Sequence, residues 1–91
     1  MSDAAARPRA REGVILRPLE DEWVLYDPVA QELHTVNRSA ALIWAHCTGD
    51  ETTEDIVAAL AAVYEHQVTP EQLAADVTRA LAMFRERGLL A

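Results

Sequence analysis

The apolar pattern of the sequence changes its period at Asn37, and this change constrains the fold more than any other feature. Before Asn37, short apolar runs alternate with turn residues, and the segment from Glu32 to Val36 alternates in character at period two. After Asn37, apolar residues recur at helical spacing almost to the carboxyl terminus. A block of strands followed by a block of helices predicts an α+β domain.

Three strand-like runs make up the first block. They extend from Val14 to Pro18, from Trp23 to Tyr26 and from Glu32 to Val36. Polar residues between Glu20 and Glu22 predict the first turn, and Asp27-Pro28 favours the second. Short connections of this kind join neighbouring antiparallel strands, so we expect a three-stranded antiparallel sheet.

Two helices are expected directly after the strands. Asn37 is a good N-cap for the first helix, which should close at Thr48-Gly49 because glycine adopts the left-handed conformation readily. Thr52 and Thr53 offer hydroxyl caps for the second helix, which is expected to end near His66.

The third helix has the clearest boundary in the chain. Thr69-Pro70-Glu71-Gln72 combines an N-cap hydroxyl, a proline at the first helical position and a capping-box glutamine. The helix should close at Gly88, with Leu89 and Leu90 folding back onto the core. Its inward face is expected to consist of Leu73, Val77, Ala80, Leu81 and Phe84.

Length and composition favour one cytoplasmic domain. Residues 1–12 are rich in Ala, Arg and Pro and are expected to form a flexible tail, while residues 13–91 form the domain. The amino terminus lacks the apolar core of a signal peptide, and no apolar run reaches the roughly 18 residues of a transmembrane helix. The single cysteine, Cys47, permits no internal disulfide.

Charge and residue types disfavour several function classes. The net charge of −7 repels phosphate backbones and anionic lipid surfaces, so neither nucleic acid nor membrane is an expected partner. With only three glycines, the chain lacks a glycine-rich phosphate loop, and we expect no cofactor.

The candidate reactive residues are few. His46 and Cys47 are adjacent, so on a helix their side chains diverge by about 100°, which suits neither one metal ion nor a nucleophile pair. A buried Cys47 and a surface His46 are the favoured interpretation over a thiol activated by His34. The carboxylates cluster in a turn and at helix starts, where solvent and helix dipoles account for them. We therefore expect neither a metal site nor an enzyme.

The expected sheet has one open edge. Arg17 and Pro18 blunt the first strand, whereas the strand from Glu32 to Val36 contains neither proline nor lysine. A groove between this edge and the third helix could offer an extended peptide main-chain hydrogen bonds and apolar contacts. The alternatives are that a helix or a second copy of the chain covers the edge, the latter giving a homodimer.

Several segments together resemble a known family. They are Trp23 to Pro28, Leu33 to Trp44, Thr48-Gly49, Asp55 to Leu60, Asp76-Val77 and Leu81 to Leu90. Their order and spacing resemble the pyrroloquinoline-quinone biosynthesis protein D (PqqD) family from Gly13 to the carboxyl terminus. The resemblance implies a winged-helix-like fold and a non-catalytic peptide chaperone, or recognition element, for ribosomally made and post-translationally modified peptides. It also implies two partners, the leader of a precursor peptide and a modifying enzyme such as a radical-SAM protein, a cyclase or a leader protease.

The resemblance also implies a binding site. The leader would add as a strand along Glu32, Leu33, His34, Thr35 and Val36, and would face the third helix. One flank of that helix holds Asp76, Met83 and Arg87 beside Ala80, and the other holds Ala74, Thr78 and Arg85. The first flank is slightly favoured. Arg85 and Arg87 have two possible roles, as solvated residues at the helix end or as anchors for a leader carboxylate, and both interpretations stay open. For His34, a packing role and a role in the groove also both stay open.

Two other functions compete with peptide recognition. A winged-helix DNA-binding regulator could share the fold, but Asp50, Glu51, Glu54 and Asp55 crowd the start of the helix that would enter the major groove. A structural subunit of a larger enzyme would use the same edge.

Overall fold

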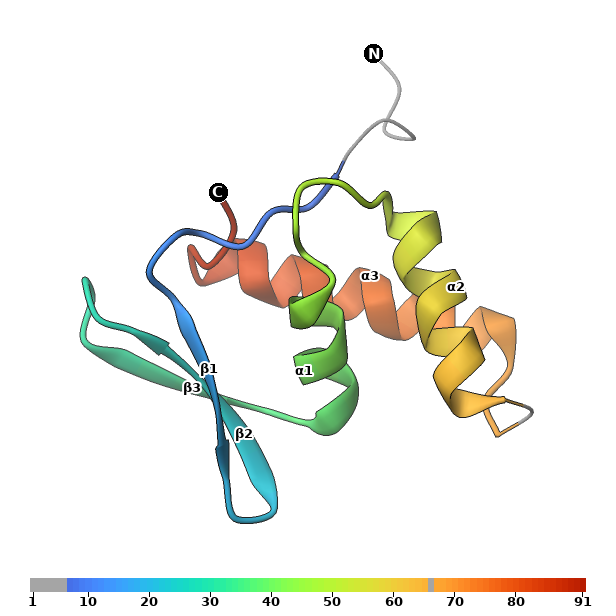
Figure 1. Ribbon diagram of the computed structural model, residues 1–91, viewed down its shortest axis with the longest axis horizontal. Coiled ribbons are helices and arrows are strands. Elements are labelled where there is room, and N and C mark those ends of the chain that lie inside the picture. The colour runs from blue at the N-terminus through green and yellow to red at the C-terminus, as the bar shows by residue number, and fades with distance from the viewer. Residues whose placement is uncertain (1–6, 66) are drawn as a thin grey trace.

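The protein is described by a computed structural model that covers residues 7–65 and 67–91. The elements are β1 (Ile15–Leu19), β2 (Glu22–Asp27), β3 (Glu32–Val36), α1 (Arg38–Ala45), α2 (Thr53–Tyr64) and α3 (Pro70–Glu86). The strands form one antiparallel sheet in the order β1-β2-β3, and Figure 1 shows it on one side of the helices. The expected α+β fold, a three-stranded antiparallel sheet followed by three helices, is confirmed. His66, near which α2 was expected to end, lies outside the described residues.

Both connections between strands occur at the turn residues predicted from the sequence. In the β1–β2 hairpin Leu19 pairs with Glu22, and Glu20 adopts a positive φ of 54°. In the β2–β3 connection, the Asp27 carboxylate accepts the N–H groups of Val29 and Ala30 at 3.1 and 3.3 Å. This is the local hydrogen bonding by which aspartate initiates turns.

Every second residue of the sheet points toward the helices. Leu25 pairs with His34 and Trp23 pairs with Val36, and these residues lie on the side of the core. Leu25 is fully buried, whereas Leu33, one position before His34, is 66% exposed. The period-two alternation therefore fixes which β3 side chains face α3.

Each helix begins at its expected cap. The Asn37 side chain accepts the Ala40 N–H at 2.8 Å at the start of α1. Reciprocal capping boxes open the other two helices, with Thr52 and Asp55 at α2 and with Thr69 and Gln72 at α3.

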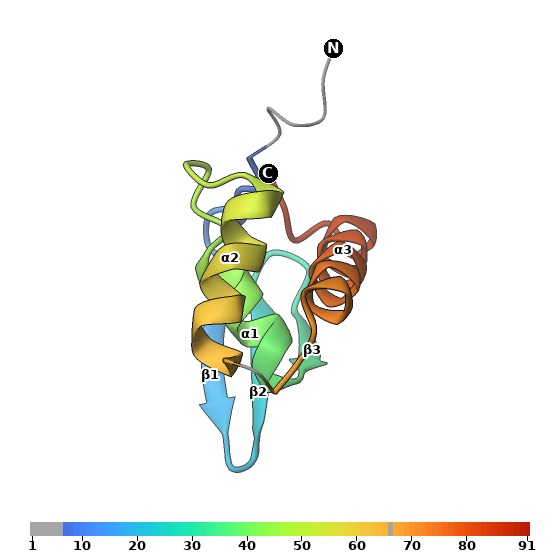
Figure 2. The ribbon, with the colours of Figure 1, turned by 90° about the vertical axis from the view of Figure 1, so that its right-hand side faces the viewer.

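The buried face of α3 builds the core. Its buried residues are Leu73, Val77, Ala80, Leu81 and Phe84, as expected. The Phe84 ring meets Trp44 of α1 edge to face, with ring centroids 5.2 Å apart. After Gly88, which has a positive φ of 69°, Leu89 folds back and is fully buried. Figure 2 shows that β3 is the strand next to α3.

The amino-terminal segment differs from the flexible tail expected for residues 1–12. Residues 1–6 lie outside the described residues, but Arg9 bridges Thr48 and Ala10 bridges Leu90. The Arg11 guanidinium forms an ion pair with Asp27, whose side chain is only 3% exposed. Residues 9–11 therefore pack on the domain, because segments distant in sequence supply their partners.

We expect the Arg11–Asp27 pair to make stability depend on acid pH. The Arg11 hydrogen bond, assisted by the Ala30 and Val29 N–H groups, outweighs burial and holds the Asp27 pKa below its ordinary value. A depressed folded pKa contributes stability that is present above the unfolded pKa of about 3.9 and is lost as pH falls through the folded pKa. Arg11→Ala should therefore destabilise the domain most near pH 7, and the gap to wild type should close in acid.

Urea unfolding of both proteins between pH 7 and pH 3 measures this gap. Arg17→Ala, which removes an exposed arginine of β1, is the control and should show no such trend. A difference between wild type and Arg11→Ala that stays constant across the pH range would contradict the expectation.

Candidate functional site

A groove of about 330 Å³ lies between the end of β3, the start of α1 and one flank of α3. Its β3–α1 side consists of Thr35, Val36, Asn37, Ser39 and Ala40, and its α3 side of Asp76, Arg79, Ala80 and Met83. The β3–α1 junction positions the first set because the Asn37 cap turns the chain directly from strand into helix. The groove is therefore bounded by a sheet edge on one side and a helix on the other.

The β3 edge beside this groove is open in the described part of the chain. β3 pairs with β2 alone, and no other described strand lies beyond it. Thr35, which lines the groove, is exposed. An edge of this kind leaves every second pair of backbone N–H and C=O groups free to template a further strand.

On the helix side, the structure distinguishes the two flanks of α3. Asp76, Ala80 and Met83 recur at helical spacing along the wall of the groove. Arg85, from the other flank, lines a separate hollow with Arg9 and Thr53. The flank that faces β3 is thus the one slightly favoured from sequence, although peptide binding there stays a prediction.

Arg87 and His34 join the end of α3 to β3. An Arg87 guanidinium nitrogen lies 3.5 Å from His34 Nδ1, and His34 Nε2 lies 3.5 Å from a Glu32 carboxylate oxygen. The His34 side chain is 11% exposed, and its Nε2 has no hydrogen-bond partner in the described part of the chain. His34 therefore faces α3, and among the described residues its ring nitrogens make only the two long polar contacts to Arg87 and Glu32.

Four groove residues were not among the sequence predictions: Asn37, Ser39, Ala40 and Arg79. Arg79 carried a detectable signal, because it lies three residues after Asp76 and four before Met83 and so shares their stripe. Its guanidinium pairs with the Asp76 carboxylate at 3.1 Å. Asn37 was predicted only as the cap of the first helix, and Ser39 was given no role; its Oγ donates to the Asn37 side chain at 3.0 Å.

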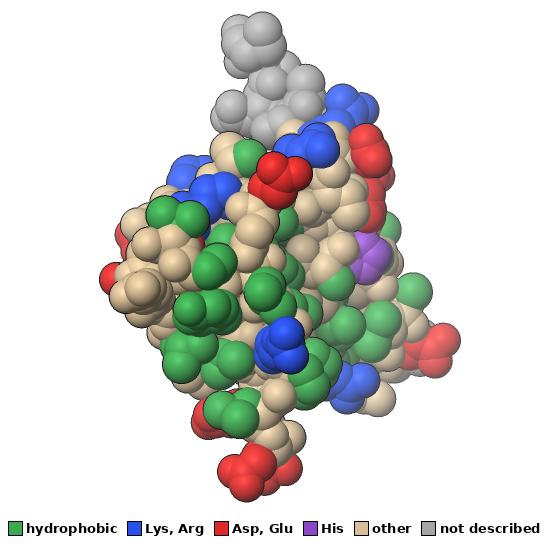
Figure 3. Space-filling view, turned by 60° about the vertical axis from the view of Figure 1, so that its left-hand side comes forward, with side chains coloured by type: hydrophobic (Ala, Val, Ile, Leu, Met, Phe, Trp, Pro, Cys, Tyr) green, Lys and Arg blue, Asp and Glu red, His purple; other side chains and the backbone are tan. Residues whose placement is uncertain are grey.

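Three of the five predicted strand residues lie outside the groove lining: Glu32, Leu33 and His34. Leu33 is exposed on the face of the sheet that points away from the helices, and Glu32 is exposed beside the β2–β3 turn. Figure 3 views the sheet side, where hydrophobic side chains gather around basic ones. Leu33 and Glu32 could contribute to the proposed site through their backbone, since β3 includes both.

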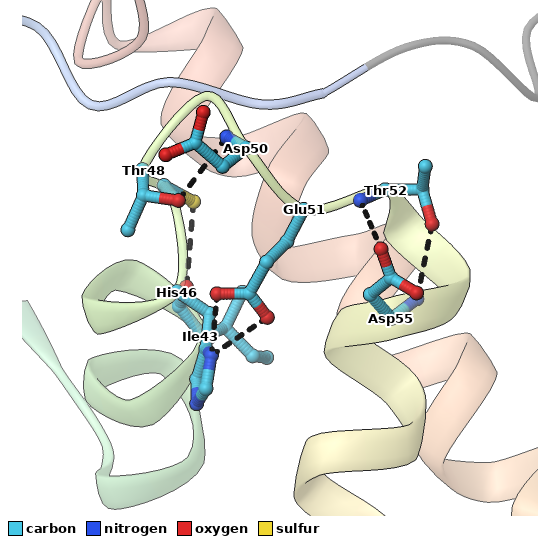
Figure 4. A network of polar contacts seen from close by, with 8 residues as sticks. Ile43, His46, Thr48, Asp50, Glu51, Thr52 and Asp55 are labelled. Carbon is cyan, nitrogen blue, oxygen red and sulfur yellow. Dashed lines mark hydrogen bonds and ion pairs between the residues drawn. The ribbon is translucent and has the colours of Figure 1, made fainter.

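The surroundings of Cys47 favour a structural role for its thiol over a catalytic one. Burial, reinforced by the Glu51 charge, raises the pKa of the Cys47 thiol to about 12. The Cys47 Sγ donates to the Ile43 carbonyl at 3.3 Å. Nearby, the Glu51 carboxylate contacts His46 Nδ1 at 3.0 Å, and Figure 4 shows these two side chains directed at each other. A thiol with a raised pKa is a poor nucleophile at neutral pH.

Within residues 7–65 and 67–91, the structure brings together no three His, Cys, Asp or Glu side chains that could hold a metal ion. None of the helices in the same ranges is long and apolar enough to cross a membrane.

Comparison with known proteins gives one family and two related structures. The model of the family described as coenzyme PQQ synthesis protein D (PqqD) matches residues 22–90. TbiB1 in complex with the TbiA(beta) leader peptide is 22% identical, with a TM-score of 0.73 over 90% of this chain and 93% of that chain. Lasso peptide synthetase B1 complexed with the leader peptide is also 22% identical, with a TM-score of 0.76 over 94% and 99% of the chains. A comparison with curated proteins gives no significant match.

Proposed function

The chain belongs to the PqqD family, and from this premise we propose that it is a non-catalytic module that captures the leader of a ribosomally made precursor peptide. The observation that carries the proposal is the open edge of β3 beside the groove against α3. Two proteins of the same fold are complexed with leader peptides, which supports a peptide as the ligand.

In the proposed complex, the leader lies antiparallel to β3 as a fourth strand. Backbone groups between Glu32 and Val36 bond the leader main chain, which gives affinity with little dependence on sequence. Every second leader side chain turns toward α3, where Ala80 and Met83 offer apolar contact. The proposed site comprises Glu32, Leu33, His34, Thr35, Val36, Asp76, Ala80, Met83 and Arg87.

The module needs a partner that performs the chemistry. We propose a modifying enzyme, such as a radical-SAM protein, a cyclase or a leader protease, acting in the cytoplasm on the captured peptide. The module itself would contribute binding and orientation and would need no cofactor. A second copy of the chain would occupy the same β3 edge, so dimerisation and leader binding should compete.

No observation favours the DNA-binding alternative. α2 begins with Glu54 and Asp55 in its first turn and has no basic residue in its last turn. Carboxylates at this end would meet DNA phosphates at close range, which costs affinity.

An amide NMR titration tests the proposal. The amino-terminal part of the precursor encoded beside this chain should shift the backbone amide signals of residues 32–36, and also those of Ala80 and Met83. Signals of α2 on the distant side should stay in place and provide the internal control. Shifts confined to α2, or no binding at all, would overturn the proposed function.

A further inference from the structure

Arg87 is the arginine near the proposed peptide path whose charge is left uncompensated. Within residues 7–65 and 67–91, no carboxylate lies within ion-pair distance of the Arg87 guanidinium, whose one polar contact is the 3.5 Å approach to His34. Arg79, further along the same face, already pairs with Asp76. The nearby Glu32 carboxylate is directed at the opposite ring nitrogen of His34. Arg87 is therefore available to a carboxylate supplied from outside.

Two contacts fix the relative direction of β3 and α3. The end of β3, at Thr35 and Val36, shares the groove with Asp76, Ala80 and Met83, whereas His34, earlier in β3, meets Arg87 at the end of α3. The two elements therefore run in opposite directions along the groove. A peptide added antiparallel to β3 would pass Met83 first and Arg87 second.

The spacing of Met83 and Arg87 matches that of an extended peptide. The two residues are four positions apart on α3, which corresponds to about 6 Å along the helix axis. Alternate side chains of a β-strand are about 6.6 Å apart and point to the same side. Consecutive groove-facing side chains of one bound peptide could therefore meet Met83 and Arg87 in turn.

We propose that the groove selects peptides in which an aliphatic residue is followed, two positions later, by aspartate or glutamate. This inference rests on the proposed function and names the class of peptide that the same site takes. The aliphatic side chain packs on Ala80 and Met83, and the carboxylate pairs with the Arg87 guanidinium, a geometry that favours bidentate hydrogen bonds. Because Arg87 is exposed, the carboxylate should improve affinity by about fivefold.

A displayed library of random 12-residue peptides tests the inference without a known ligand. It is selected on wild type, on Arg87→Gln and on Arg85→Gln, the matched control from the other flank of α3. Wild type and Arg85→Gln should enrich an acidic residue two positions after an aliphatic one, and Arg87→Gln should enrich the aliphatic residue alone. The best peptide, synthesised with Glu and with Gln at the acidic position, should show the fivefold difference in Kd on wild type and none on Arg87→Gln.

The possible failures are distinguishable. Enrichment of extended apolar peptides with the same acidic preference on Arg87→Gln as on wild type, or with no acidic preference on either, overturns the role of Arg87 and leaves peptide capture intact. Failure to enrich any peptide on the wild-type protein overturns the proposed function itself. Both variants alter exposed side chains, and their amide spectra establish that they are folded.

Discussion

Phe84→Ala should lower the free energy of unfolding by about 3–5 kcal/mol, the usual cost of truncating a buried aromatic residue. Phe84 is fully buried and meets Trp44 edge to face, so alanine leaves a cavity between α3 and α1. A domain of this size is stable by about 5–15 kcal/mol, and the variant should therefore unfold at much lower urea concentration. Urea denaturation followed by tryptophan fluorescence measures the change, since Trp44 reports the contact directly.

Two variants serve as controls for this loss. Phe84→Leu keeps most of the buried volume and should cost clearly less than the alanine substitution. Glu86→Ala changes an exposed residue two positions away and should stay within about 0.5 kcal/mol of wild type. A loss below about 1 kcal/mol for Phe84→Ala would mean that the α1–α3 contact is not part of a tightly packed core.

Much of the fold was predictable because its signals are local. The Asn37, Thr52 and Thr69 caps depend on residues at most three positions away, and each forms in the structure. The buried face of α3 follows from helical periodicity alone. The packing of residues 9–11 could not be inferred in this way, because Arg11 gains its partner Asp27 only when the chain has folded.

The candidate site was likewise predictable only where its signals are local. The open edge of β3 could be inferred from the absence of proline and lysine between Glu32 and Val36, and three of the four predicted α3 residues line the groove. Asn37 was missed as a groove residue, because its role as the cap of α1 accounts for it without a groove. Ser39 was missed with it, because Ser39 Oγ donates to that cap side chain. The choice between the flanks of α3 needed the crossing of α3 and β3, which no short sequence pattern encodes.

Thr35→Pro should weaken leader binding at least about tenfold, because proline removes a backbone donor and its ring intrudes on the approaching strand. In the proposed register, the Thr35 N–H points to the open edge and bonds the leader main chain. Isothermal titration of wild type and variant with the leader of the neighbouring precursor measures the effect. Thr35→Val, which keeps both the N–H group and the branched side chain, should bind as wild type does.

Hydrogen exchange provides an independent check of this register. In the free protein the Thr35 amide should exchange rapidly, and the bound leader should slow its exchange as the new strand hydrogen bond forms. An amide spectrum close to that of wild type would show that Thr35→Pro keeps its fold. Two results would contradict the proposed register: unchanged affinity in that folded variant, or a Thr35 amide that is already protected without peptide. Either result would mean that the N–H groups of His34 and Val36, rather than that of Thr35, point to the open edge, because outward-pointing N–H groups alternate along a strand.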